Sequence, residues 1–126
     1  MFDRMIVQKA LKRSWSFNNN RGQMANNLAD GQDKLTSLLV YDIFGGEILK
    51  TQMKKGWHFH NRIDGESIDF TELETEKSSK DKVWMDQPSS PDEIYNYIVD
   101  EDYSSLFTRF IRAYEEAVGL EKTILV

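Results

Sequence analysis

Apolar and polar positions recur along the chain with two different periods, which predict helices and strands within one α+β domain. Residues 33–44 have leucines at helical spacing and further apolar residues around most of the remaining circumference. A helix that is apolar nearly all round is buried, so we expect this one at the centre of the fold. Gly45-Gly46 follows it directly and suits a helix C-terminus, where glycine readily adopts the left-handed backbone.

Alternation with a period of two is clearest at residues 56–71. Two alternating runs flank Asp64-Gly65, the dipeptide favoured in the type I′ turn of a two-residue β-hairpin. Side chains two apart on a strand share a face, and so do directly opposed side chains. One face of the predicted hairpin therefore carries His58, His60, Asp69 and Thr71, and the other carries Trp57, Phe59, Ile68 and Phe70.

Weaker patterns complete the predicted outline. Asp3 suits the N-cap of a first helix that carries Ile6, Ala10 and Leu11 and ends near Trp15. Ser90 and Pro91 suit the cap and first position of a further helix. The other predicted elements are an Asn- and Gly-rich loop at 16–32, strands at 47–51 and 83–85, and a last helix at 102–118 that buries Tyr103, Phe107, Phe110, Ile111, Tyr114 and Val118.

Length and composition place the chain among soluble globular proteins. Its 126 residues fit a single domain spanning 1–126, and 40% hydrophobic with 29% charged residues is ordinary for such a domain. No apolar run is long enough to cross a membrane, and the N-terminal residues carry charges where a signal peptide would be apolar. We therefore expect a cytoplasmic protein that does not bind membranes.

The absence of cysteine narrows the possible chemistry. A chain with no cysteine has no disulfides, no thiolate zinc site and no thiol nucleophile. No cofactor is expected either. Two histidines close together with carboxylates nearby could in principle bind a metal, but His-x-His is common by chance, so we predict no metal site.

Charge is distributed unevenly along the chain. Residues 1–63 hold ten Lys/Arg and five Asp/Glu, a balance of +5, whereas residues 64–126 hold six and sixteen, a balance of −10. No basic stripe with interleaved aromatics is present, so nucleic acid is not an expected partner. The acidic half could instead contact a basic surface on another protein.

Two blocks of the sequence resemble a known family. "GQDKLTSLLVYDIFGGEIL" and "WHFHNRIDGESIDFT", followed by an Asp-Gln-Pro-Ser-Ser segment and a terminal helix, are similar to the YunG family of small bacterial proteins, whose blocks resemble "GQCxVTALVVxDxLGGEI" and "HYxN…DLT". The resemblance implies a compact papain-like (cysteine-proteinase-like) fold, with a buried central helix on a small antiparallel sheet. It also implies a site formed by a Cys, a His and a carboxylate.

Carried over position by position, the presumed catalytic residues fall on Asp33, His58 and Asp69. The nucleophile position therefore holds a carboxylate. Asp33 has two interpretations: a plain helix N-cap, or a site carboxylate that faces His58. Gln32, His60 and Thr71 are candidate binding residues beside this remnant site.

Hydroxyl groups offer few substitutes for the missing thiol. Thr36 and Ser37 lie one turn inside the predicted helix, where hydroxyls usually bond back to the helix's own carbonyls. Thr71 shares the His58 face, although a β-branched strand residue needs no catalytic role. The leading hypothesis is a catalytically inactive pseudoenzyme that binds a small molecule or a protein, and the alternatives are a hydrolase or transferase with a non-thiol mechanism and an acidic decoy for a basic partner.

Overall fold

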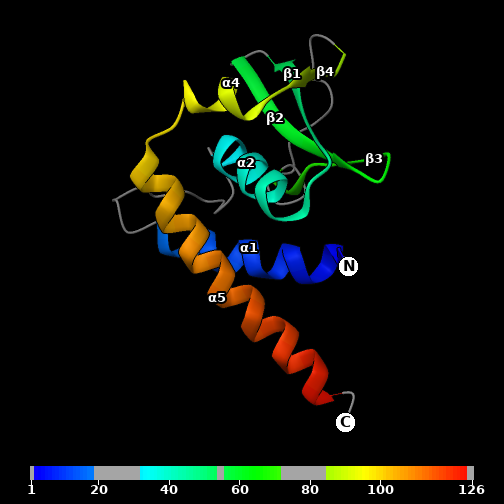
Figure 1. Ribbon diagram of the computed structural model, residues 1–126, viewed down its shortest axis with the longest axis vertical. Coiled ribbons are helices and arrows are strands. Elements are labelled where there is room, and N and C mark those ends of the chain that lie inside the picture. The colour runs from blue at the N-terminus through cyan, green and yellow to red at the C-terminus, as the bar shows by residue number, and fades with distance from the viewer. Residues whose placement is uncertain (1, 19–31, 54–55, 72–84, 125–126) are drawn as a thin grey trace.

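Helix α2 lies at the centre of the molecule, between a small sheet and a pair of helices (Figure 1). The computed structural model describes residues 2–18, 32–53, 56–71 and 85–124. Strands β1 to β4 form one antiparallel sheet in the order β3-β2-β1-β4. The elements are α1 (Arg4–Asn18), α2 (Asp33–Phe44), β1 (Glu47–Met53), β2 (Gly56–Ile63), β3 (Glu66–Ile68), β4 (Gln87–Ser89), α4 (Pro91–Tyr95) and α5 (Asp100–Ile124).

The first core cluster joins α1, α2 and α5. Trp15 is 1% exposed, and its indole Nε1 donates a 3.0 Å hydrogen bond to the Thr36 hydroxyl, which fixes α1 against α2. Asp3 caps α1 as predicted, because its Oδ1 accepts hydrogen bonds from the backbone of Met5 and Ile6. The cluster's fully buried residues include Val7, Leu11, Leu39, Val40, Leu106 and Phe110.

Helix α2 begins and ends at the residues predicted for it. Leu38 faces the sheet in a second cluster with Ile48, Phe59 and Ile94. The Gly45-Gly46 pair ends the helix with positive φ at both residues. A Cβ at Gly46 would lie 2.4 Å from the Arg62 carbonyl oxygen, so only glycine lets β1 start this close to β2.

The β2–β3 hairpin has the predicted turn and register. Asp64 and Gly65 have φ of 53° and 79°, as a type I′ turn requires, and Asn61 pairs with Ile68. The prediction that the second strand continues to Thr71 is wrong, because β3 ends at Ile68 and residues 70–71 are helical. Asp69 Oδ1 accepts a 2.9 Å hydrogen bond from the Thr71 hydroxyl, a local bond that favours a turn over an extended strand.

Several other predicted boundaries differ from the structure. Helix α1 runs past Trp15 to Asn18, so residues 16–18 of the predicted loop at 16–32 are helical, and residues 19–31 lie outside the described part of the chain. Two residues of the strand predicted at 83–85 lie outside the described part of the chain, and Met85 is not in a strand. A strand that was not predicted, β4, follows at 87–89. Pro88 is accommodated there because β4 is an edge strand.

The last two helices start with clear sequence signals. Ser90 caps α4 by accepting a hydrogen bond from the Glu93 N–H, with Pro91 at the first helical position as predicted. Helix α5 begins at Asp100 rather than 102, and its acidic first turn complements the helix dipole. In the described residues, no helix is both long and apolar enough to cross a lipid bilayer.

Candidate functional site

His58 lies between two carboxylates that come from different parts of the chain. Its Nε2 is 2.6 Å from Asp69 Oδ2, and its Nδ1 is 3.7 Å from Asp33 Oδ2. The three side chains are only 12–14% exposed. The strand β2, the turn after β3 and the N-terminus of α2 therefore bring together the three residues that the family resemblance selects.

Asp33 faces the sheet instead of capping its own helix. It is the first residue of α2, and Gln32 occupies the N-cap position without a side-chain capping hydrogen bond. The Asp33 Oδ2 atom accepts a 2.9 Å hydrogen bond from the Phe59 N–H. The interpretation of Asp33 as a plain N-cap is therefore wrong.

The position at which β3 ends explains why a carboxylate is favourable at residue 33. The β2–β3 ladder stops at the Asn61–Ile68 pair, so the Phe59 N–H lies beyond the last pair of that ladder. A buried backbone donor needs an acceptor, and the Asp33 carboxylate provides it. Lys34 Nζ lies 3.8 Å from the same oxygen and adds a positive charge on its outer side.

Asp69 connects His58 to Thr71. One carboxylate oxygen contacts the imidazole and the other accepts the hydrogen bond from Thr71 Oγ1. Thr71 is 3% exposed. Thr71 therefore orients the carboxylate that orients His58, and its hydroxyl proton is already donated.

His60 belongs to a second polar group beside the first. Its Nε2 lies 3.5 Å from Asp86 Oδ2, and Asp86 also accepts a hydrogen bond from the Thr51 hydroxyl. The His60 ring stacks on His58 with 6.5 Å between centroids. Burial lowers the pKa of His60, and it outweighs the opposing effect of the Asp69 and Asp86 carboxylates.

The two histidines do not converge on a common metal position. The described residues contain no group of three or more His, Asp or Glu side chains placed to hold a metal ion. Each imidazole is instead matched with its own carboxylate. Within this part of the chain, the arrangement is one of hydrogen-bonded pairs.

The hydroxyls of α2 are also engaged. Ser37 Oγ donates a 2.6 Å hydrogen bond to the Asp33 carbonyl, as predicted for a helix-internal serine. Thr36 Oγ1 instead accepts from the Trp15 indole and is 3% exposed. Neither hydroxyl is directed at His58 as a nucleophile would be.

Three residues around the site were not selected from the sequence. Asn61 is 2% exposed and donates a 3.0 Å hydrogen bond to the Ser37 carbonyl, which ties β2 to α2. The signal was available, because Asn61 falls in the apolar row of β2 with Phe59. Lys34 Nζ lies over the rings of Phe59 and Tyr97, at 5.6 and 5.5 Å from their centroids, and Tyr97 is 51% exposed.

Fold and site together define a small α+β protein in which a strand histidine is held between two carboxylates at the start of a buried helix. Residues 4–115 match the family described as YunG protein, and the chain belongs to that family. It is 34% identical over 106 residues to "Uncharacterized protein YunG" of Bacillus subtilis (strain 168), covering 84% of this chain and 90% of that protein. No solved structure matches the chain.

Proposed function

We propose that this YunG-family chain is a non-catalytic binding protein with a papain-like fold. In this proposal, the residues of a former catalytic site form a buried network of charged side chains that supports the fold. The observation that carries the proposal is the position of Asp33. Its carboxylate stands at the helix start, facing His58 Nδ1, where the family resemblance implies a cysteine. A His and its orienting carboxylate are present, and among the described residues no competent nucleophile faces them.

Chemical considerations argue against Asp33 as a nucleophile. A carboxylate attacks carbonyl carbon poorly, and this one already accepts the Phe59 N–H and lies near two cationic or proton-donating side chains. Each of these contacts stabilises the negative charge and reduces its nucleophilicity. The hydroxyls of Ser37 and Thr71 are donated to oxygen atoms of the protein.

The surface beside the site supports binding. Tyr97 packs on Phe59, with 5.9 Å between ring centroids, yet remains half exposed, and Tyr95 and Val99 are exposed as well. Clustered exposed apolar side chains are typical of interaction surfaces. No Lys, Arg or His occurs between residues 85 and 108, so this surface suits a partner that carries apolar and basic groups.

The acidic-decoy hypothesis is a more specific form of this binding proposal, because it names a basic protein surface as the ligand. Asp100, Glu101 and Asp102 follow the exposed Tyr95–Val99 segment directly. A partner with a basic surface would be attracted to this region by charge and held by the aromatic side chains. Strong weakening of binding by salt would favour the decoy hypothesis over recognition of a neutral ligand.

The test combines an activity assay with a binding map. The wild-type protein should hydrolyse neither p-nitrophenyl acetate nor fluorogenic peptides above the buffer rate. A fragment screen read by ¹H–¹⁵N NMR should include hits that shift the Lys34, Phe59 and Tyr97 amides. Tyr97→Ala should remove those shifts, whereas Met5→Ala, a change of an exposed apolar side chain on α1, should retain them.

Two results would overturn the proposal. Hydrolysis that His58→Ala abolishes would show an active enzyme with an unrecognised nucleophile. Fragment hits that cluster elsewhere and ignore Tyr97 would show that the surface beside the site does not bind ligands.

A further inference from the structure

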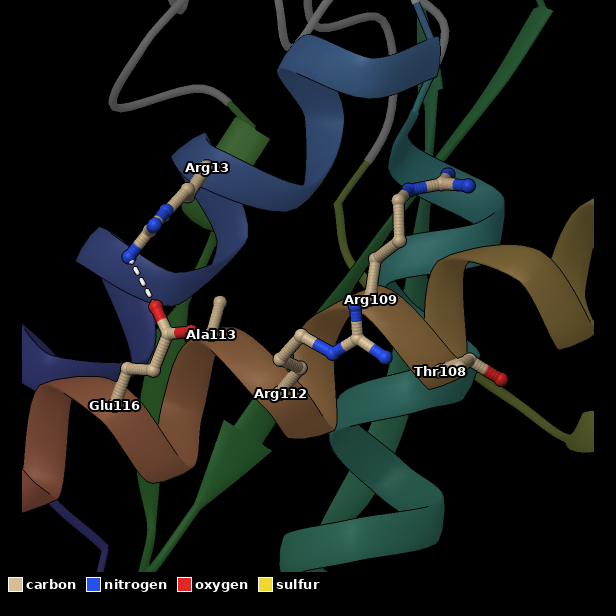
Figure 2. Close-up of a pocket in the computed structure, with 6 residues that line it drawn as sticks. All are labelled: Arg13, Thr108, Arg109, Arg112, Ala113 and Glu116. Carbon is tan, nitrogen blue, oxygen red and sulfur yellow. Dashed lines mark ion pairs between the residues drawn. The ribbon is translucent and has the colours of Figure 1, made fainter.

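A cavity of about 440 Å³ lies between α1 and α5 (Figure 2), and none of its lining residues belongs to the His58 site. Its lining residues are Arg13, Thr108, Arg109, Arg112, Ala113 and Glu116. Small-molecule sites typically range from about 300 to 1,000 Å³, so this cavity is large enough for a small ligand. Three of its six lining side chains are guanidinium groups.

The three arginines have different roles in this cavity. Arg13 reaches from α1 to Glu116 on α5, where the two form a 2.6 Å ion pair that balances both charges (Figure 2). Arg109 Nε donates a 3.3 Å hydrogen bond to the Ser14 carbonyl, and its guanidinium also contacts Ser105. These contacts fix the position of Arg109 relative to α1.

Arg112 differs from the other two. It is exposed, and no hydrogen bond or ion pair joins its guanidinium to another described residue. Figure 2 shows the Arg112 side chain directed along α5 toward Thr108, beside the base of Arg109. Residues three apart share a helix face, so Arg109 and Arg112 lie on the same side of α5, and Figure 2 shows their guanidinium groups at separate positions, with that of Arg109 extending away from Arg112.

The location of this basic group is unusual for the chain. Residues 64–126 contain six Lys/Arg against sixteen Asp/Glu, yet two of those six line this cavity. General basicity therefore does not explain the cluster. A site that selects anions does explain it.

We propose that the α1–α5 cavity binds the phosphoryl group of a phosphorylated small molecule through Arg109 and Arg112. A guanidinium donates in a fixed fork that matches two phosphate oxygens, and two such forks can engage the three terminal oxygens of a phosphate monoester. Thr108 lies on the same face, but its hydroxyl already donates a 3.0 Å hydrogen bond to the Ser104 carbonyl, so the two arginines are the donors of this site. The Ala113 methyl and the arginine stems leave apolar room for the rest of the ligand.

The experiment is a titration of the full chain with phenyl phosphate and with inorganic phosphate at constant ionic strength, read by ¹H–¹⁵N NMR of the arginine Nε–H groups. Saturable shifts should appear at Arg109 and Arg112. Arg112→Gln should weaken binding by about tenfold or more, since a charge-assisted hydrogen bond typically contributes at least that factor. Arg4→Gln, which removes an exposed arginine from the start of α1, should leave the affinity unchanged.

A second variant sharpens the test. Glu116→Gln releases Arg13 from its ion pair and should tighten phosphate binding. Absence of saturable shifts in the wild-type protein would overturn the proposal, as would an Arg112→Gln affinity that equals that of the wild type or of Arg4→Gln. Circular dichroism of each variant establishes that it is folded, and the result is independent of whether the His58 site binds anything.

Discussion

The His58 site and the α1–α5 cavity both gather charged side chains, but they do so in opposite ways. Around His58, each carboxylate has partners within a buried network that joins α2, β2 and the turn after β3. In the α1–α5 cavity, Arg13 and Glu116 pair near the surface, and Arg112 is left without a partner among the described residues. The first group is enclosed by protein, and the second faces solvent.

This difference predicts that the His58 site contributes to folding stability and that the α1–α5 cavity contributes to ligand binding. A buried charge that loses its partner is costly, whereas an exposed charge contributes little to folding. The Asp33 network should therefore matter most for the free energy of unfolding. The arginine cavity should matter for ligands and hardly at all for stability.

The largest expected effect comes from removing the Asp33 carboxylate. Asp33→Ala should lower the free energy of unfolding by about 2–4 kcal/mol, because the buried Phe59 N–H loses its acceptor and His58 loses a neighbouring anion. Asp33→Asn keeps an oxygen acceptor and should cost less. Urea denaturation at pH 7 measures both values.

Arg112→Ala is the matched control for that comparison. It removes a charged side chain from a helix that is exposed at this position, and it should change stability by less than about 0.5 kcal/mol. Equal losses for Asp33→Ala and Arg112→Ala would show that the two charge clusters do not differ as proposed.

A smaller effect is expected from the pH dependence of His60. Because burial holds its pKa below the ordinary value of 6.5, the unfolded chain takes up a proton that the folded chain resists. The contribution of neutral His60 to stability is therefore present above pH 6.5 and is lost as the pH falls below it. His60→Gln should reduce the loss of unfolding free energy between pH 7.5 and 5.5, and an unchanged loss would contradict this assignment.

The sequence was most informative where local signals and burial agreed. The α2 boundaries and the Asp64-Gly65 turn followed from apolar pattern and from glycine, and the turn then determined the register of β2 against β3. The end of β3 was missed because alternation continues through Phe70, while the Asp69–Thr71 hydrogen bond favours a helical turn. A side-chain bond of this kind competes with strand pairing and leaves no trace in the hydrophobic pattern.

The site was only partly predictable for a similar reason. Family resemblance selected Asp33, His58 and Asp69, but residue periodicity could not show that the Asp33 carboxylate accepts the Phe59 N–H. That contact depends on where β3 ends and on how α2 packs against β2. The α1–α5 arginine cavity was missed entirely, since its lining residues come from two helices that are far apart in sequence and are brought together only by packing.

Whether position 33 was once a nucleophile position can be measured through the pH dependence of iodoacetamide alkylation in Asp33→Cys. If position 33 is a former nucleophile position facing His58, the thiol should titrate well below the free value of about 8.5, because the helix N-terminus and a nearby imidazolium both favour the thiolate. Adding His58→Ala should raise that pKa again. A thiol that titrates like free cysteine, with no response to His58→Ala, would show that position 33 is not a former nucleophile position.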